Sequence, residues 1–321
     1  TIRLTDYGAR ANDSADDSPA FRAALADLSG GGTLLLPDGV LYLDAPVHVT
    51  RSNVTIRGGG MDQTQIVVRM TKQAAGEGEA AFLIEGDRGG SLGKVADTAL
   101  RGSRRINLTA DAPDLPSGTL LWFAAENDDA FLRALGTQSW DERYPQLQQF
   151  FSPVSAVAGS RISTLRSLDL DLPPGTDVRL VRPAKNVVLE RFGIRHEIPG
   201  ARPAEAAFVY ENLYPDYQVS SIRYLWAEGG GVRDVAIEMT GKHALAFERS
   251  YAIEGEGVIV NGAWNKGKGG TGYVRFSQAQ RCTLRDVDIR GIRHVVFQWG
   301  ASHNRIVSSR LYVDVNFHGG F

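Results

Sequence analysis

The chain has 321 residues, 43% of them hydrophobic and 22% charged, so it can bury a large core and is not disordered as a whole. Its 35 Lys and Arg against 37 Asp and Glu leave a net charge of −2, which indicates neither a nucleic acid nor a membrane as partner. The single cysteine, Cys282, excludes a disulfide framework and cysteine-based zinc sites, and no apolar run is long enough to cross a membrane.

A capped helix and then short strands are predicted near the N-terminus. An acidic stretch precedes a segment in which Phe21, Leu25 and Leu28 fall on one helical face, and three glycines end that helix. Short strands separated by Pro-Asp-Gly and triple-glycine turns follow at 33–36, 40–43 and 54–57.

Four motifs in residues 4–69 together resemble the entry segment of the pectate-lyase-like superfamily of right-handed parallel β-helices. They are Asp6-Tyr7-Gly8-Ala9, Asp16-Asp17-Ser18-Pro19-Ala20-Phe21, the run 31–39 and Asn53-Val54-Thr55-Ile56-Arg57-Gly58. The resemblance implies an all-β solenoid with an N-terminal capping helix, a polysaccharide or oligosaccharide partner, and a secreted or periplasmic location. Because the superfamily includes lyases, hydrolases, epimerases and phage tailspikes, it leaves the reaction open. Its tailspike branch implies a homotrimer.

The regular spacing of short strands is lost in residues 100–185, which predicts a large insert flanking a binding groove. We expect a strand at 120–123, a helical segment from Asp128 to Phe151, and a hairpin from 161–165 and 168–172. The tract Trp140–Tyr144 is expected to pack within this insert. The predicted organisation is an N-terminal cap with the first coils (1–99), the insert (100–185) and the later coils (186–321).

The later coils carry two apolar columns that repeat at about 24 residues, as a stacked solenoid requires. One column consists of Val235–Ile237, Val258–Val260, Val287–Ile289 and Leu311–Val313. The other consists of Phe247, Phe276, Phe297 and Phe321. Because the pattern stops in mid-coil, we expect the natural polypeptide to continue, or another chain to cover this end.

Alternation along each strand places the residues beside these columns on the outer surface. The outward set includes Glu248, Arg275, His294, Gln298 and His318. His294 and His318 are 24 residues apart, so the sequence predicts that they lie one strand spacing apart, about 4.8 Å.

Local charge favours an acidic substrate. Residues 231–310 contain nine Arg and three Lys against seven acidic residues, a net +5 within a chain of −2. Removing the proton beside a uronate carboxylate needs a cation and a base. We therefore predict cleavage of an acidic polysaccharide by β-elimination, with His294 or His243 as base beside Arg293 and Lys242. The substrate-binding candidates are Arg275, Lys266, Trp264, Trp299, Glu248, Gln298, His318, Tyr214 and Trp226.

Two alternatives remain open. A glycoside hydrolase would use paired outward carboxylates such as Glu238 and Asp288, although the polygalacturonase motifs and the Asp-Pro-His motif of alginate epimerases are absent. A non-catalytic tailspike or adhesin would bind glycan without turnover. No cofactor is predicted. Calcium bridges uronate to enzyme in some members of the superfamily and stays open, because no tight acidic cluster demands it.

Overall fold

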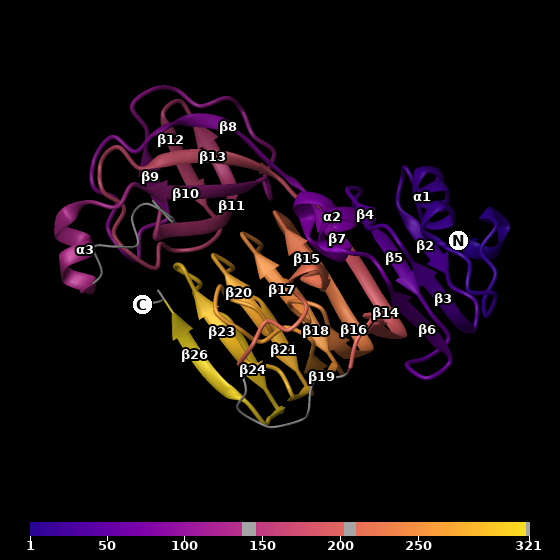
Figure 1. The fold of residues 1–321 in the computed structure, drawn as a ribbon. Coiled ribbons are helices and arrows are strands. Elements are labelled where there is room, and N and C mark those ends of the chain that lie inside the picture. Colours follow the sequence, from indigo (N-terminus) through magenta and orange to yellow (C-terminus); the bar gives the residue numbers. More distant parts are fainter. Residues whose placement is uncertain (137–145, 202–209, 319–321) are drawn as a thin grey trace.

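The computed structural model of this protein describes residues 1–136, 146–201 and 210–318. Parallel strands form two sheets, A and B, that run the length of the molecule, and a smaller antiparallel sheet lies beside them (Figure 1). The prediction of an all-β fold built from stacked parallel strands is confirmed.

The elements have the following bounds. Sheet A contains β1 (Ile2–Arg3), β2 (Gly32–Leu35), β3 (Gly39–Leu43), β5 (Val54–Arg57), β6 (Thr64–Val68), β14 (Ala184–His196), β16 (Ala227–Thr240), β18 (Glu254–Glu256), β19 (Ile259–Ala263), β21 (Thr283–Arg285), β22 (Asp288–Arg290), β24 (Arg305–Val307) and β25 (Arg310–Leu311). Sheet B contains β4 (Val47–Val49), β7 (Ala80–Glu85), β15 (Ser220–Leu225), β17 (Leu245–Glu248), β20 (Tyr273–Ser277), β23 (His294–Gln298) and β26 (Asp314–His318).

The antiparallel sheet and the helices complete the structure. The sheet contains β8 (Asp87–Lys94), β9 (Arg105–Asn107), β10 (Leu120–Ala125), β11 (Gln148–Ala158), β12 (Arg161–Thr164) and β13 (Asp177–Arg182). The helical segments are η1 (Leu4–Tyr7), α1 (Ser18–Asp27), α2 (Lys72–Ala75), η2 (Gly76–Gly78), α3 (Asp129–Leu135) and η4 (Pro215–Tyr217). None of the helices in the described residues is long and apolar enough to cross a membrane.

The chain visits sheets A and B in turn, so each circuit places a new strand beside an earlier one. Strands β18, β19 and β20 are followed by β21, β22 and β23, and these by β24, β25 and β26. Two residues separate the two sheet A strands of each circuit, and the first of them has positive φ, at Gly257, Asp286 and Ser308. A single residue in the left-handed conformation bends the chain sharply. Glycine and short polar residues adopt this conformation at the lowest cost. Each circuit therefore turns at the same place.

A ladder of aromatic rings fills the interior behind sheet B. Phe247, Phe276 and Phe297 lie opposite one another, with ring centroids 5.3 and 4.6 Å apart, which confirms that part of the predicted column. Tyr224 begins the ladder, and Phe317 continues it 5.4 Å from Phe297. Assigning this place to Phe321 was wrong, because the last circuit is four residues shorter than predicted. Phe321 itself lies outside the described residues.

The same shortening moves the second apolar column. The register pairs Ile237 with Val260 and Val260 with Ile289, so the first three predicted segments stack as expected. Leu311 lies opposite Ile289 rather than Val287, two residues away from the predicted alignment. One continuous core nevertheless runs from Leu4 to Val295, because the inward parity is unchanged.

The insert has its own core and a second one that joins it to the coils. Trp122 meets Trp226 edge to face, with ring centroids 5.3 Å apart. Gln149 Nε2 donates a hydrogen bond to the carbonyl of Trp299 (2.9 Å), and α3 contributes Leu132 to a cluster with the Trp299 ring. The insert therefore lies against the ends of the later sheet B strands, as Figure 1 shows.

Two predictions about the insert were wrong. The helix spans only Asp129–Leu135, because residues 148–158 form the central strand β11 of the antiparallel sheet. Strand β12 pairs with β11 and β9 instead of forming a hairpin with 168–172. The tract Trp140–Tyr144 lies outside the described residues.

Candidate functional site

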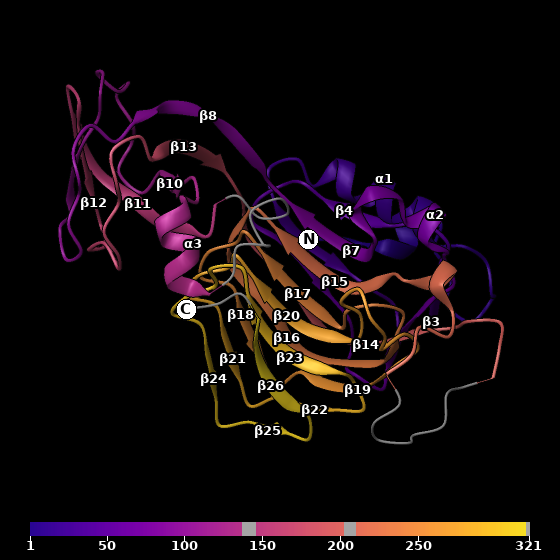
Figure 2. The same cartoon turned by 60° about the vertical axis from the view of Figure 1, so that its left-hand side comes forward.

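Two adjoining pockets lie on the outer face of sheet B, across strands β15, β17, β20, β23 and β26. Figure 2 shows these strands in succession. The arginine pocket, of about 430 Å³, is lined by Glu77, Gly78, Glu79, Ser220, Arg223, Leu225, Lys242, His243, Glu248, Arg249, Arg275, Ser277 and Gln278. The histidine pocket, of about 540 Å³, is lined by Lys242, Lys268, Gly269, Gly270, Tyr273, Arg275, Arg293, His294, Val296, Gln298, Trp299, Asn316 and His318. Because both include Lys242 and Arg275, they form one groove across the strands.

The groove is strongly cationic. Six Lys and Arg line it against three Glu, and parallel pairing brings these charges together from successive circuits. The outward residues immediately before the aromatic ladder form one row, in which Arg223, Ala246 and Arg275 lie opposite one another. The residues immediately after it form a second row, with Glu248, Ser277, Gln298 and His318.

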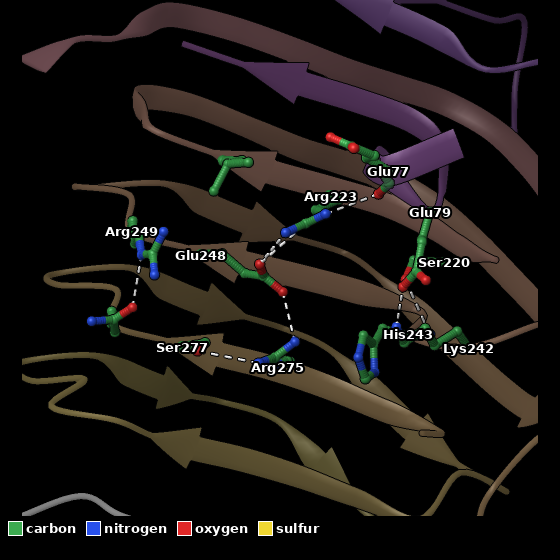
Figure 3. Close-up of a pocket in the computed structure, with 13 residues that line it drawn as sticks. Glu77, Glu79, Ser220, Arg223, Lys242, His243, Glu248, Arg249, Arg275 and Ser277 are labelled. Atoms are coloured by element: carbon green, nitrogen blue, oxygen red, sulfur yellow. Dashed lines mark hydrogen bonds and ion pairs between the residues drawn. The ribbon is translucent and has the colours of Figure 1, made fainter. Parts of the chain in front are cut away.

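Glu248 is held between two guanidinium groups in the arginine pocket (Figure 3). Arg223 Nη2 and Nε donate to Glu248 Oε2 at 2.6 and 3.1 Å, and Arg275 Nη1 donates to Glu248 Oε1 at 2.8 Å. Burial would raise the pKa of Glu248, but Arg275 and Arg223 outweigh it and hold the pKa below its ordinary value. Glu248 is therefore a carboxylate, while the group as a whole carries one excess positive charge.

A second group of the same kind contributes Glu79 and Lys242 to the lining of the arginine pocket. Glu79 accepts hydrogen bonds from Lys242 and from Lys72, the latter at 2.9 Å. Burial acts to raise the pKa of Glu79, and the two lysines lower it below its ordinary value. Two ammonium groups again face one carboxylate.

Three rings are stacked along the groove. His243 stacks on Tyr273 with centroids 5.4 Å apart, and Tyr273 contacts the ring of His294 at 5.6 Å. His294 Nδ1 lies 2.7 Å from Asp314 Oδ1, on the neighbouring strand. Because a carboxylate only accepts hydrogen bonds, the neutral form of this imidazole carries its proton on Nδ1 and has its lone pair on Nε2. Among the described residues, no hydrogen bond to Nε2 of His294 is formed.

His243 is only 2% exposed, and neither of its ring nitrogens has a hydrogen-bond partner among the described residues. Burial, followed by the charges of Arg275, Lys242 and Arg223, lowers its pKa well below the ordinary value. The ring is therefore neutral and cannot carry positive charge into the groove.

Two cations in the histidine pocket have no carboxylate partner among the described residues. Arg293 donates to the carbonyl of Gly267 and lies over the rings of Tyr210 (5.1 Å) and Tyr273 (6.0 Å). Its buried Nε has no acceptor in the described part of the chain. Lys268 is exposed on the preceding loop. Both charges lie beside His294.

Several predicted sugar-binding side chains are covered by other parts of the chain. Trp264 is 7% exposed and donates through Nε1 to the carbonyl of His196, while Tyr214 covers it edge to face at 5.5 Å. Trp226 is also 7% exposed, because the insert covers it. The predicted substrate-binding roles of Trp264 and Trp226 are therefore wrong. Lys266 is half-buried and is not among the residues that line the groove.

Other predicted residues do line the groove, but with different neighbours. Arg275, Gln298, Glu248, Lys242 and Arg293 are there with His243 and His294. Trp299 lines the histidine pocket but is only 6% exposed, because it packs against Leu132 of α3 and Leu147. His318 lies opposite Gln298, and His294 lies opposite Asp314, so the predicted pairing of these two histidines was wrong. The shortened last circuit shifts His318 by four residues.

The carboxylates predicted for hydrolysis lie away from the groove. Glu238 and Asp288 are on sheet A, in β16 and β22. Asp288 binds Arg290 through both oxygens at 2.7 Å. In the groove, the pKa values of Glu79 and Glu248 are lowered, whereas a glycosidase acid needs a raised one. These positions do not favour the hydrolase.

Sequence reasoning missed Arg223, Glu79 and Tyr273. Arg223 precedes Tyr224 just as Arg275 precedes Phe276, so extending the aromatic column by one circuit would have found it. The alternation that exposes His294 could likewise have found its strand neighbour Tyr273. Nothing in the local sequence indicates that Glu79, 163 residues before Lys242, meets it.

A calcium site is not supported by the donors present. Within the ranges described above, no group of three or more His, Cys, Asp or Glu side chains is arranged to hold a metal ion. The acidic side chains Glu79 and Glu248 of the groove instead bind Lys and Arg, so their oxygens are already engaged.

Acid should destabilise this fold because histidines are buried in neutral form. Burial lowers the pKa of His196 to about 3, and its ring bonds to Ser221 Oγ at 2.9 Å. The unfolded chain therefore binds more protons as pH falls from about 6.5 to 3, and stability falls through that window. We expect a lower thermal midpoint at pH 4 than at pH 7 and a weaker pH dependence in His196→Gln. An equal pH dependence in the variant would contradict this assignment.

Comparisons with known proteins identify the fold. No protein-family model matches the chain, and no curated protein is significantly similar to it in sequence. Among solved structures, the tailspike protein gp49 of Pseudomonas phage LKA1 is similar with a TM-score of 0.72 and 15% identity, over 100% of this chain and 55% of that one. Tailspike gp61 of Pseudomonas phage phi297 gives 0.63 and 13%, over 96% of this chain and 59% of that one.

A third tailspike is known with a saccharide bound. Gp54 of Acinetobacter baumannii bacteriophage AP22, solved in complex with A. baumannii capsular saccharide, gives a TM-score of 0.54 and 9% identity, over 95% of this chain and 50% of that one. The chain thus spans 50 to 59% of the length of these three proteins. The similarity supports the predicted fold of stacked parallel strands, and at these identities it establishes the fold alone.

Proposed function

We propose that this chain is the right-handed β-helix part of a glycan-processing protein that cleaves an acidic polysaccharide by β-elimination in the groove over sheet B. The observation that carries this proposal is the histidine pocket, where an imidazole oriented by Asp314 lies beside two cations, Arg293 and Lys268, that no described carboxylate neutralises. The lowered pKa values of Glu79 and Glu248 do not favour either residue as the acid of a hydrolase.

His294 is the proposed base. Its Nδ1–H donates to Asp314, which leaves the Nε2 lone pair to take the proton from the carbon beside the uronate carboxylate. Asp314 is a positioning residue, since it fixes the tautomer and stabilises the imidazolium that forms.

Arg293 and Lys268 are the proposed electrostatic partners of the substrate carboxylate. As the proton leaves, negative charge develops on that carboxylate. Cations in a partly desolvated pocket stabilise this developing charge more than they stabilise the bound substrate. Arg293 is held by Gly267 and two aromatic rings, so it is already oriented before substrate arrives.

The elimination is balanced by one proton given to the leaving oxygen. The C–H bond breaks toward His294, a carbon–carbon double bond forms, and the adjacent C–O bond breaks to release the next sugar. Tyr273 contacts the His294 ring at 5.6 Å, and burial keeps its phenol protonated by raising its pKa. We assign Tyr273 as the donor of that proton.

The same fold favours a second function, that of a tailspike-type receptor binder. The three tailspikes with similar folds support it, because one of them binds a capsular saccharide. Under either function we propose an extracellular polysaccharide partner and a homotrimeric assembly. We further propose that the chain has three parts, a cap with the first coils (1–99), the insert (100–185) and the later coils (186–321).

Incubation with a panel of acidic polysaccharides tests the reaction. Elimination should produce ultraviolet absorbance from the unsaturated sugar together with new reducing ends. Reducing ends without that absorbance would favour a hydrolase, and binding without either product would favour the receptor binder.

A further inference from the structure

The arginine pocket contains more positive charge than its own carboxylates neutralise. Arg223 and Arg275 share Glu248, and Lys242 and Lys72 share Glu79. Each group is left with one unbalanced positive charge, although Lys72 is not part of the lining. Arg249 and Glu77 also line the pocket, so its walls carry four Lys and Arg against three Glu. Figure 3 shows Glu248 between its two arginines, with Lys242 and Glu79 at the other side.

These charges are substantially removed from solvent. The side chains of Arg223, Arg275 and Lys242 are 18 to 20% exposed. Charge excess in a site of low dielectric is unfavourable unless an anion enters, so the pocket attracts one more strongly than an exposed patch would.

His243 supplies an independent indication of a ligand. Its ring is 2% exposed in the wall of this pocket, and both of its nitrogens lack a hydrogen-bond partner among the described residues. Buried polar atoms are rarely left unpaired. A neutral imidazole offers one N–H donor, which suits an anionic oxygen.

We infer that the arginine pocket is a second anion subsite, which binds a carboxylate or sulfate group on a sugar other than the one that is cleaved. Glu248 lies on β17, two strands from His294 on β23, and two strand spacings amount to about 10 Å. That separation is too large for both acidic groups to belong to one sugar ring. The substrate class is therefore a glycan with acidic groups on more than one sugar. The inference rests on the proposed function only in taking the ligand to be a saccharide.

Calorimetric titration tests this subsite without requiring turnover. The probes are trigalacturonate, its fully methyl-esterified form and a sulfated neutral trisaccharide, each titrated into the whole chain. We expect trigalacturonate or the sulfated sugar to bind and the ester to bind at least tenfold more weakly; the probe that binds tighter identifies the anion. Arg223→Gln should lower the affinity for the acidic probe at least tenfold. Arg290→Gln, which removes an ion-paired guanidinium on sheet A, is the matched control and should change nothing.

Glu248→Gln provides a second readout if Arg223→Gln does not fold. Removing the resident carboxylate leaves two guanidinium groups unpaired, so the acidic probe should raise the thermal midpoint of this variant more than that of the unmodified chain. Equal binding of acid and ester, no binding of either anion, or no such rescue would overturn the subsite. Anion binding that depends on Arg223 but gives no unsaturated product would overturn the elimination and leave the subsite standing.

Discussion

Replacing His294 with Ala is expected to lower kcat by about 10²–10⁴-fold, because the proton acceptor of the elimination is lost. KM should change little, since Arg293 and Lys268 still hold the carboxylate. Asp314→Asn should lower kcat by roughly 10–100-fold and change the pH–rate profile, because an amide in place of the carboxylate can bind either tautomer of the imidazole. The measurement is the initial rate of ultraviolet absorbance with the best polysaccharide of the panel.

A matched histidine provides the control. His48 on β4 also binds a carboxylate, with Nε2 2.8 Å from Glu85 Oε2, but it is not among the residues that line the groove. His48→Ala should keep kcat within about twofold of the unmodified chain. If His294→Ala also retained its rate, the base would have to be another residue, and Tyr273 would be the next to replace.

Replacing Phe247 with Ala is expected to destabilise the fold by about 3–5 kcal/mol. The ring is fully buried between Tyr224 and Phe276, with centroid distances of 5.8 and 5.3 Å, so its removal leaves a cavity between two circuits. Thermal unfolding followed by circular dichroism should show a midpoint lower by roughly 5–15 °C.

Phe317 is the control for this effect because it occupies the same ladder but is 75% exposed. Phe317→Ala should lower the free energy of unfolding by less than about 1 kcal/mol, since little apolar surface leaves the interior. Equal losses for the two variants would contradict the view that stacking between covered circuits stabilises this fold.

The alternation of apolar and polar residues along each strand, and the length of the repeat, were sufficient to predict the stacked strands. They also predicted the outward position of several groove residues. Val235, Phe247 and Phe276 point inward because a strand exposes alternate side chains, and that parity predicted Glu248, Arg275 and His294 on the surface. The parity rule holds within each strand. It fails between strands wherever a circuit changes length, as it does for His318.

Tryptophans were the least predictable residues, because a sequence does not indicate what covers a ring. Trp226 and Trp299 are both corner residues with positive φ at the end of a sheet B strand. The insert packs on those corners with residues more than 40 positions away in the chain. Trp264 is covered in the same way by Tyr214.

By itself, the sequence determined which side of each strand faces the core, because that depends only on alternation along a few neighbouring residues. It also determined that the later coils are basic, which is a matter of composition. Only the tertiary structure decided which charges share a site. Asp314 orients His294, Arg223 shares Glu248 with Arg275, and Glu79 meets Lys242, because the number of residues in each circuit sets the register between strands.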